Sequence, residues 1–509
     1  MKKLFSEIKS ALPEPLFDEY PEFIELYWKA WELAWDHVKD IPGMPQTPYM
    51  DEGFCDTDIW IWDTCFMALY CKYAPAELYP GYQSLQNFYS VLHDNGQLPE
   101  IIARNVPIDG PIKAGEKARI RIHIADNPPL FAWAEYENAK ISGNLEHIRK
   151  LLLEKRYLQK HYDFLENTPA GSVIPGVKVK THWEKADLGY RWEGGVSGMD
   201  NTPRGRSGKT SDKQRPATRD LLWIDAICQQ AMAANIIGKL FALLKMDDEA
   251  AVWQKRFEEK RQIIRKYYWD EEEKFFFDRS SSTGELCKVA SAGSYWALTS
   301  GAADEKQAKA MESHLNDPEK FGGNRPWVSL SRSDGDFNAE NGMYWRGSVW
   351  LPTAYAGLKG CANYGLFQTA RKTAISLLGH MYRTFKNYTP HTIWECYAPC
   401  DDAPARSCDE NNRIVREDFC GWSALGPIAA FIEFAIGIYD IDAFKKVVKW
   451  HLPEKTTGKT GIKNLRFGDI TADLIAENGT VSVNSTGDFT LEINGETFPV
   501  SAGKNIFTR

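Results

Sequence analysis

About a dozen segments with apolar residues at helical spacing follow one another along this chain, and they constrain its fold more than any other feature. In the first segment Phe23, Tyr27 and Trp31 recur at every fourth position, so they share one face of a helix. Hardly any run before residue 455 alternates as a half-buried strand would, and the pattern therefore predicts an all-α body. The expected helices are 17–38, 60–73, 78–92, 128–141, 145–165, 218–244, 249–268, 290–299, 305–315, 350–358, 364–385 and 421–438.

Four long connections separate groups of these helices, at 93–127, 167–217, 316–349 and 387–420. Loops of this length are uncommon unless they carry function. They also hold most of the glycine, proline, tryptophan and acidic residues that would be out of place in a core. Long loops gathered at one end of an all-α body are what a ring of helical hairpins around a central pocket requires.

The pattern changes after Lys455, where apolar residues alternate with polar ones and two Asn-Gly pairs mark turns. We therefore expect a helical domain at 1–455 and a small β-rich module at 456–509. A module this short buries too little surface to be secure alone, so we expect it to dock on the helical body. The alternating residues are Val481, Val483, Phe489, Leu491 and Ile493, and the turns are Asn478-Gly479 and Asn494-Gly495.

Charge and composition favour a neutral small molecule as the partner. The net charge of −8 and the lack of a long basic run argue against nucleic acid and against an anionic membrane. Aromatic residues make up 13% of the chain and offer flat surfaces for sugar rings. The first residues contain no apolar run of signal-peptide length, and we expect no membrane span. The ten cysteines lack disulfide-type spacing, which favours a reducing cytoplasm.

We expect no cofactor and no metal ion. Four cysteines crowd into one late loop without a histidine, and we interpret them as reduced thiols. The acidic loop 334–341 resembles a calcium loop in oxygen content but lacks its full spacing, so we interpret it as a surface loop. The histidines His182, His380 and His391 show no ligand spacing. The four cysteines are Cys396, Cys400, Cys408 and Cys420.

One lone acid, Asp200, stands in a glycine-rich loop at 194–206. Glycines allow positive φ and a close approach of the backbone, so such a loop can present a single carboxyl group. Apolar walls from Trp192 and Met199 would disfavour the charged form, which raises the pKa of the carboxyl and suits it to donate a proton. The alternative is that Asp200 only ties the turn together through backbone amides.

Six motifs in order resemble the signature of the trehalase and glycoside hydrolase family 63 group, and within it the mannosylglycerate hydrolase type. The resemblance extends over residues 20 to 440, and it implies an (α/α)6 toroid, a barrel of six helical hairpins with the active site at one mouth. Asn127 stands where the family usually has glutamine, and the chain has no segment for the β-sandwich that precedes many family 63 domains. The motifs are WIWDTCF at 60–66, NPPLFAWA at 127–134, SGMDNTPR at 197–204, YWRGSVW at 344–350, WECY at 394–397 and EDFCGW at 417–422.

The resemblance assigns roles to individual residues. Asp200 matches the family's general acid and Glu395 its general base. Asp63, with Trp62 beside it, matches the carboxylate that holds sugar hydroxyls in the deepest subsite. The remaining expected substrate contacts are Arg204, Tyr344, Trp345, Arg346, Gly347, Trp394, Tyr397, Glu417 and Trp422.

The chemistry of these residue types supports the assignment. Inverting glycoside hydrolysis needs one carboxylic acid to protonate the leaving oxygen and one carboxylate to activate water on the opposite face of the sugar. Asp200 and Glu395 lie on the second and fourth long loops, as opposite walls of a pocket require. An acid such as Asp63 amid apolar residues is costly unless it is paired, and Arg346 is one candidate partner. Trp60, Trp62 and Trp350 have core packing as the alternative to sugar binding.

The sequence therefore predicts an inverting glycoside hydrolase that acts on an α-linked glucoside, mannoside or glycosyl-glycerate. Two alternatives stay open. An inverting phosphorylase on a similar toroid would keep the acid but replace the base with phosphate, and Glu395 argues against it. A sugar-binding protein without catalysis would need aromatic surfaces but no acid and base pair.

Overall fold

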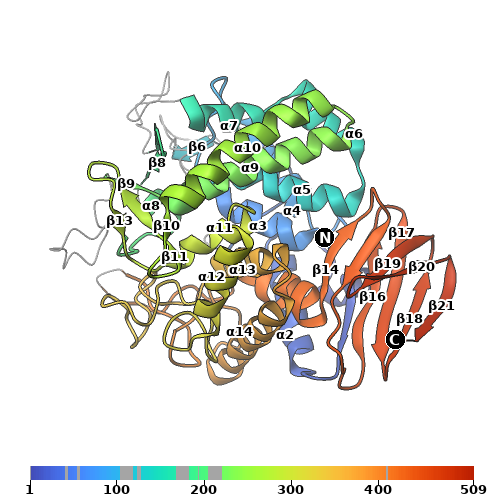
Figure 1. Cartoon of the computed structure of the whole chain (residues 1–509). Coiled ribbons are helices and arrows are strands. Elements are labelled where there is room, and N and C mark those ends of the chain that lie inside the picture. The colour runs from blue at the N-terminus through green and yellow to red at the C-terminus, as the bar shows by residue number, and fades with distance from the viewer. Residues whose placement is uncertain are drawn as a thin grey trace.

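The computed structural model describes residues 2–40, 44–53, 58–103, 119–122, 128–167, 183–192, 194–204, 220–408 and 411–508. Figure 1 shows a body of helices and long loops, with a β-rich part on one side that carries the C-terminus. The two parts are continuous in sequence through the last helix of the body.

All twelve expected helical segments are helical in the structure. The expected helix 145–165 is interrupted, because Arg156 has a positive φ of 54°. The α-helices are α1 Phe5–Ile8, α2 Glu22–Asp36, α3 Ile61–Cys71, α4 Gly81–Ser90, α5 Phe131–Ser142, α6 Leu145–Arg149, α7 Tyr157–Asn167, α8 Gly194–Ser197, α9 Ile224–Leu243, α10 Asp247–Tyr267, α11 Trp296–Thr299, α12 Glu305–Asn316, α13 Leu351–Asn363 and α14 Phe367–Asn387. The 3₁₀ and π helices are η1 Lys9–Ala11, η2 Lys150–Glu154, η3 Ala292–Tyr295, η4 Ser423–Leu425 and η5 Gly426–Ile436.

Six helices of the body contact one another in a closed series. α3 packs on α5, α5 on α9, α9 on α11, α11 on α13, α13 on η5, and η5 again on α3. Further helices cover this series from outside, with α4 on α3, α7 and α10 on α9, and α2 and α14 on η5. The closed series buries apolar residues on nearly every side of α3, α9 and η5, as helices surrounded by other helices require.

Four of these helical runs begin directly after a tryptophan. The residues are Trp60 before α3, Trp223 before α9, Trp350 before α13 and Trp422 before η4. The long loops lie at the same ends of these helices and are joined to one another. Tyr344 N donates to Arg406 O at 2.9 Å, and Gly421 N donates to Glu52 O at 3.0 Å. These hydrogen bonds join the third long loop to the fourth, and the segment that follows the fourth loop to the residues after Met50.

The expectation of hardly any strand before residue 455 was wrong, because fifteen short strands lie there in the described residues. None of them exceeds five residues, which is too short for the alternation that identifies a strand in a sequence. They are β1 Glu14–Phe17, β2 Val38–Lys39, β3 Tyr49–Met50, β4 Asp58–Trp60, β5 Ile101–Ala103, β6 Arg119–Ile122, β7 Glu184–Ala186, β8 Gly189–Arg191, β9 Leu221–Leu222, β10 Trp269–Asp270, β11 Phe275–Phe276, β12 Asp278–Ser280, β13 Leu286–Cys287, β14 Ile438–Asp442 and β15 Val447–Trp450.

The C-terminal part contains two sheets with strand orders β1-β16-β17-β18-β21 and β14-β15-β19-β20. The expected alternating residues from Val481 to Ile493 are buried, and both Asn-Gly pairs form turns with positive φ. The β structure takes strands from outside 456–509, since β14 and β15 precede this range and β1 comes from the start of the chain. Its strands are β16 Thr460–Phe467, β17 Ile470–Glu477, β18 Thr480–Ser485, β19 Phe489–Ile493, β20 Glu496–Val500 and β21 Gly503–Thr508.

The two sheets face each other and contact the helical body. Phe467 on β16 meets Phe489 on β19 with ring centroids 5.4 Å apart. Phe17 on β1 meets Phe431 on η5 at 5.4 Å, and Trp450 donates its indole N–H to Ile436 O at 2.9 Å. The module thus shares apolar contacts with the helix that closes the inner series.

Helix α9 is long and apolar enough to cross a membrane, and it alone passes that test among the described residues. Of its most apolar window, 78% is buried inside the molecule. The apolar surface of α9 is therefore used in packing against the neighbouring helices.

Candidate active site

The loop that carries Asp200 is pressed against the start of α3. Gly198 has a φ of 79°, and a Cβ atom there would lie 2.3 Å from the Trp62 ring. A Cβ on Gly194 would lie 2.6 Å from the carbonyl oxygen of Asp200. Glycine is therefore required at both positions, because the backbone approaches its neighbours too closely for a side chain. The glycine-rich sequence indicated such a close approach. Asp200 itself is half-buried.

Asn201 ties this loop to the third long loop. Its Oδ1 accepts a hydrogen bond from Trp345 N at 2.8 Å, and its Nδ2 donates to Met343 O at 2.8 Å. Asn201 is fully buried. Its side chain therefore fixes Asp200 relative to Tyr344, although the sequence analysis did not single it out.

Glu395 is buried and held at both carboxylate oxygens. Tyr344 Oη donates to Oε1 at 2.8 Å, and the Arg416 backbone N–H donates to Oε2 at 3.2 Å. Burial raises the pKa of Glu395 above its ordinary value, while the hydrogen bonds from Tyr344 and Arg416 oppose that rise. The backbone is fixed too, because Trp422 Nε1 and Ser423 Oγ both donate to Glu395 O. The carboxylate is thus rigidly placed and keeps lone pairs available for a further donor.

Asp200 and Glu395 line one cavity of about 340 Å³ together with Tyr344. Burial, followed by the carboxylates of Glu395 and Asp200, raises the pKa of Tyr344 far above its ordinary value. The charges of both carboxylates therefore act on the Tyr344 hydroxyl group. The rest of the lining is Ser407, Cys408, Arg413, Ile414, Val415 and Arg416.

Asp63 lies in the first turn of α3 and is completely buried. In the part of the chain that the structure describes, neither of its carboxylate oxygens has a hydrogen-bond partner in another residue. Burial and the carboxylates of Glu395 and Glu100 raise the pKa of Asp63 well above the usual range, whereas Arg416 opposes the rise. A buried carboxylate without partners destabilises the folded state. The expected alternative of an Asp63–Arg346 pair is not formed.

Glu52 is a second buried carboxylate that the sequence analysis missed. It lies after β3, and its Oε1 has no hydrogen-bond partner. Burial, then Asp63 and Asp51, raise the pKa of Glu52 well above the usual range. Its position next to Asp63 could not be read from the sequence, because no periodic pattern surrounds it.

The aromatic residues of the motifs form one packed layer under the cavity. The Trp345 and Trp350 rings are stacked with centroids 4.1 Å apart, and Trp62 meets Trp422 at 5.5 Å. Tyr397 is buried, and its hydroxyl accepts a hydrogen bond from Trp394 N at 3.2 Å. Trp394 has a buried indole N–H without a partner. Trp62 and Trp350 are buried in this layer, as the packing alternative for these two residues predicts, and Trp345 and Tyr397 are buried beside them.

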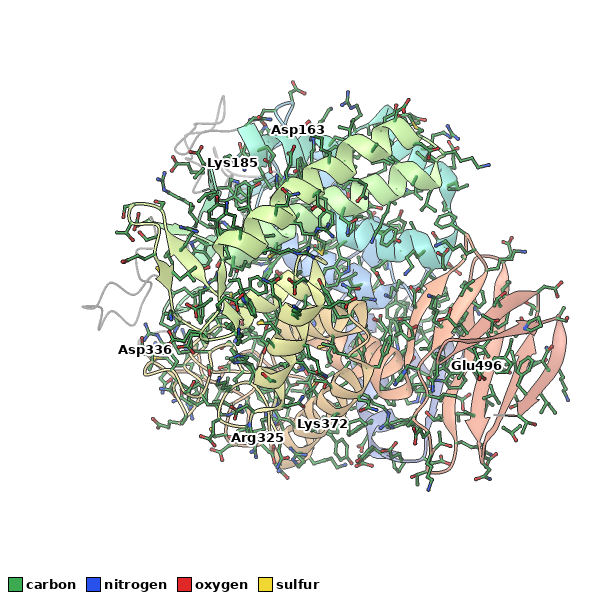
Figure 2. The ribbon with its side chains drawn as sticks, in the orientation of Figure 1. Asp163, Lys185, Arg325, Asp336, Lys372 and Glu496 are labelled. Carbon is green, nitrogen blue, oxygen red and sulfur yellow. The ribbon has the colours of Figure 1, made fainter. Side chains whose placement is uncertain are left out.

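Arg346 and Gly347 hold the third loop in shape. Arg346 Nη1 lies 3.6 Å from Asp336 Oδ1, and its Nε donates to Asn201 O at 3.3 Å. Asp336, which Figure 2 labels, belongs to the acidic loop 334–341, so one of the oxygens considered for calcium pairs with an arginine. A Cβ on Gly347 would lie 2.8 Å from the Phe337 ring, so Gly347 provides a close contact within the loop.

Two expected substrate contacts lie elsewhere. Arg204 is completely buried and forms bidentate ion pairs with Asp225 and Asp278 at 2.6–2.8 Å. Its donors are used within the fold, so the expectation of a substrate contact is corrected to a structural ion-pair centre. Glu417 is exposed and does not line the cavity, whereas its neighbour Arg416 does. The chain reverses direction beside Glu417, since Asp418 has a φ of 52°.

The remaining expectations concern a metal site, the late cysteines and the histidines. No group of three or more histidine, cysteine or acidic residues within the described ranges could hold a metal ion. Of the late cysteines, Cys396 and Cys420 are buried, Cys408 lines the cavity and Cys400 is exposed. His380 contacts Asp402 and His391 contacts Phe385 O. Asn127 and His182 lie outside the described residues.

A family model described as the mannosylglycerate hydrolase MGH1-like glycoside hydrolase domain matches residues 57–411. An uncharacterized protein from Borreliella burgdorferi is 24% identical over 472 residues, which cover 90% of this chain and 88% of that protein. The matched range contains Asp63, Asp200 and Glu395.

Three solved structures resemble the fold. A family 63 mannosylglycerate hydrolase from Thermus thermophilus in complex with glucose has a TM-score of 0.58 at 19% identity and covers 79% of this chain and 99% of its own. A neutral trehalase from Saccharomyces cerevisiae has a TM-score of 0.52 at 17% identity, covering 75% of this chain and 73% of its own. A sialidase has a TM-score of 0.68 at 13% identity and covers 99% of this chain, which spans only 40% of that protein.

Proposed function

Because the chain belongs to the mannosylglycerate hydrolase MGH1-like family of glycoside hydrolases, and is therefore a glycosidase, we propose that it inverts the anomeric centre with Asp200 as general acid and Glu395 as general base. The observation that carries this proposal is that the two carboxyl groups line one cavity from different loops. We also propose that the closed series of inner helices is an (α/α)6 toroid, with this cavity at its mouth.

In the proposed reaction Asp200 donates its proton to the departing glycosidic oxygen while Glu395 accepts a proton from the attacking water. The fixed carboxylate of Glu395 supports this role, since each oxygen accepts one hydrogen bond and retains acceptor capacity for water. A raised pKa brings Glu395 closer to the basicity that proton abstraction near neutral pH requires.

For the sugar bound in the deepest subsite, we propose that Asp63 accepts hydrogen bonds from its hydroxyl groups. Support comes from the two buried oxygens of Asp63, which have no partner in another residue that the structure describes. Glu52, whose pKa is raised in part by Asp63, offers one further acceptor without a partner among the described residues.

Among α-linked glucosides, mannosides and glycosyl-glycerates, the cavity lining favours a substrate whose leaving group carries a carboxylate. Arg413 and Arg416 line the cavity beside the two proposed catalytic acids. Guanidinium groups bind carboxylates through charge-assisted hydrogen bonds. A 2-O-glycosyl-glycerate supplies such a carboxylate, and we propose it as the first substrate to test.

The decisive experiment is proton NMR during the first minutes of hydrolysis of an α-mannosyl-glycerate and an α-glucosyl-glycerate. An inverting enzyme releases the β-anomer before mutarotation mixes the signals, whereas first release of the α-anomer would contradict the mechanism. Glu395→Gln should lose activity whatever the leaving group, and Asp200→Asn should lose it most on poor leaving groups.

The same samples separate the alternatives. A phosphorylase would require inorganic phosphate for turnover and would release a sugar phosphate. A protein that only binds sugar would show saturable binding without product in a well-folded preparation. Full activity of Glu395→Gln would exclude Glu395 as the general base.

A further inference from the structure

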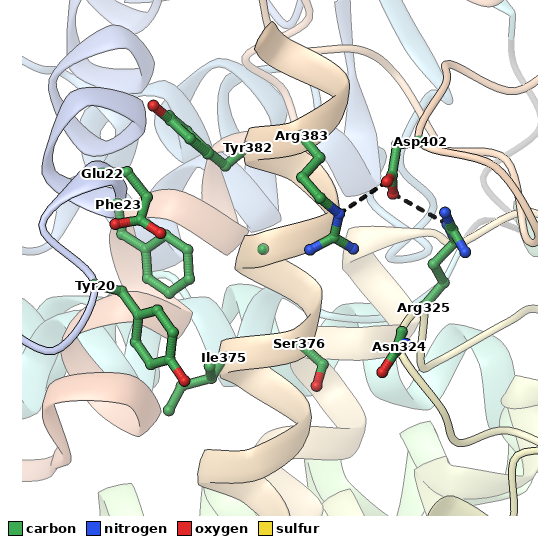
Figure 3. Close-up of a pocket in the computed structure, with 11 residues that line it drawn as sticks. Tyr20, Glu22, Phe23, Asn324, Arg325, Ile375, Ser376, Tyr382, Arg383 and Asp402 are labelled. Atoms are coloured by element: carbon green, nitrogen blue, oxygen red, sulfur yellow. Dashed lines mark hydrogen bonds and ion pairs between the residues drawn. The ribbon is translucent and has the colours of Figure 1, made fainter. Parts of the chain in front are cut away.

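The largest cavity among those described is not the one that contains Asp200 and Glu395. It measures about 590 Å³ and lies on the outside of the helical body, between the start of α2, one face of α14 and two loops. Figure 3 shows aromatic residues on one side and a carboxylate between two arginines on the other. The lining residues are Tyr20, Glu22, Phe23, Asn324, Arg325, Ile375, Ser376, Gly379, Tyr382, Arg383 and Asp402.

Asp402 organises the polar wall of this outer cavity. Arg325 Nε donates to Oδ1 at 3.1 Å and Arg383 Nε donates to Oδ2 at 2.8 Å, as the dashed lines in Figure 3 mark. His380, fully buried behind the carboxylate, places Nδ1 3.0 Å from Oδ1. Each guanidinium therefore donates only its Nε–H to the Asp402 carboxylate. Its terminal nitrogens donate no hydrogen bond to any residue that the structure describes.

A glycine in the middle of α14 makes room for one of these groups. Gly379 precedes Arg383 by one helical turn, and a Cβ there would lie 3.0 Å from Arg383 Nη1. Glycine is unfavourable inside a helix relative to alanine, so its presence at this turn calls for a local reason. The reason that the geometry offers is space for the guanidinium to lie across the helix toward the cavity.

The charges of the outer cavity balance. Arg325 and Arg383 contribute two positive charges, and Asp402 and Glu22 contribute two negative ones. Glu22, in the first turn of α2, has no hydrogen-bond or ion-pair partner in the described part of the chain. Balanced charge favours a neutral ligand over an anion. Guanidinium donors, a carboxylate acceptor, the Ser376 hydroxyl and tyrosine rings together match the many hydroxyl groups and apolar ring face of a sugar.

From these observations we propose that the outer cavity is a second, non-catalytic binding site for a neutral saccharide unit. The site is separate from the catalytic cavity but shares a loop with it. Asp402 and the catalytic-cavity residues Ser407 and Cys408 lie on the same connection. That connection is paired with Tyr397, two residues after Glu395. A saccharide held by Arg325, Arg383 and Glu22 would therefore also restrain the loop that borders the catalytic cavity.

The proposal is tested by hydrogen exchange measured by mass spectrometry, which locates protection along the chain. The protein is Glu395→Gln, chosen to prevent turnover, and the probes are methyl α-D-mannoside, methyl α-D-glucoside and inorganic phosphate. Either neutral glycoside should slow exchange in residues 20–24 and 398–404. Absence of slowing in both segments with both glycosides overturns the proposal, and slowing with phosphate alone assigns the cavity to an anion instead.

Two substitutions in the same background localise the effect. Glu22→Ala removes the carboxylate acceptor, and Gly379→Ala places a methyl group against Arg383 while favouring the helix, so loss of fold is not expected. Each should abolish the slowing in 20–24 and 398–404. Glu305→Ala, at the first-turn position of α12, is the matched control and should leave the slowing intact. Slowing that persists in both cavity variants overturns the proposal.

In the same experiment, hydrogen exchange in residues 194–204 reports separately on the catalytic cavity. Protection there without protection in 20–24 and 398–404 refutes the second site and leaves the proposed function standing. Protection in 20–24 and 398–404 that is lost in the cavity variants supports the second site whether or not 194–204 responds.

Discussion

Burial and two hydrogen bonds set the pKa of Glu395, and their effects oppose one another. Burial raises the pKa, and the hydrogen bonds from Tyr344 and Arg416 lower it. A general base works only when ionised, so activity falls as the pH drops through this pKa. Tyr344→Phe removes one stabilising donor from the carboxylate and should move the acidic limb of the kcat/KM profile to higher pH. An unshifted limb would show that Glu395 is not the group that titrates.

Asp63 illustrates a conflict between stability and function in a single side chain. Its pKa is raised in the folded protein, so the unfolded state loses its proton first and stability falls as the pH rises above the ordinary range of aspartate. Asp63→Asn should therefore raise the melting temperature at pH 7 and flatten its dependence on pH. It should also lower kcat/KM by about 100-fold or more if Asp63 binds sugar hydroxyls.

Two measurements test whether Asp63 binds the substrate and whether its burial lowers stability. A variant with unchanged kcat/KM would exclude substrate binding by this carboxylate. Thermal unfolding at pH 5 and pH 8 supplies the stability comparison, because the difference between wild type and variant should grow with pH.

The sequence predicts residue types at the site better than residue roles. Asp63 and Asp200 could be selected because acids in aromatic or glycine-rich surroundings are unusual, whereas Glu395 was selected because its motif resembles that of the family. Arg204 was assigned to substrate from the family resemblance. Its ion pairs with Asp225 and Asp278 could not be predicted, because these partners are distant in sequence and a buried ion pair leaves no local pattern. Glu52 and Asn201 act through contacts with other loops, which a linear pattern does not encode.

At the scale of elements, hydrogen bonds between loops place the proposed acid relative to the proposed base. Asn201 joins the Asp200 loop to residues 343–345, and Tyr344 in that segment binds Glu395. Asn201→Ala leaves a buried N–H and a buried carbonyl without partners, which should cost about 1–3 kcal/mol of stability. Because misplacement of catalytic groups slows chemistry, kcat should fall about 10-fold or more with a smaller change in KM.

Asn464→Ala provides the matched control for this substitution. Asn464 also donates its side-chain amide to backbone carbonyls, of Ser10 and Leu12, but in the β-rich part. Its loss should reduce stability without changing kcat. Equal effects of the two variants on kcat would indicate that Asn201 acts only through general stability.

Helices could be predicted at this scale because each one presents a periodic apolar face over several turns. The short strands could not, since two to five residues are too few to establish alternation. The two Asn-Gly turns of the C-terminal part were predictable for a different reason, namely the local preference of these residues for positive φ. The pairing of β1 with β16 had no such signal, because it joins the two ends of the chain.

At the scale of the whole molecule, the C-terminal sheets contain strands from both sides of residue 456, so a truncation there would separate paired strands. β15 precedes residue 456 and pairs in parallel with β19, and β1 near the N-terminus pairs with β16. Deletion of 456–509 therefore removes the partner of β1 and one of the two partners of β15, together with the packing of β16 against η5. We expect this variant to unfold at a clearly lower temperature than the full chain and to aggregate more readily.

Calorimetry of the full chain tests the same coupling without a truncation. Since the β-rich part takes β1 from residues 14–17 and packs Phe17 on η5, neither part keeps its contacts when the other unfolds. The full chain should therefore unfold in one cooperative transition, and a separately produced piece 438–509 should lack a cooperative transition of its own, because β1 is absent from it. Two resolved transitions in the full chain, together with a stable isolated piece, would instead establish two independent domains.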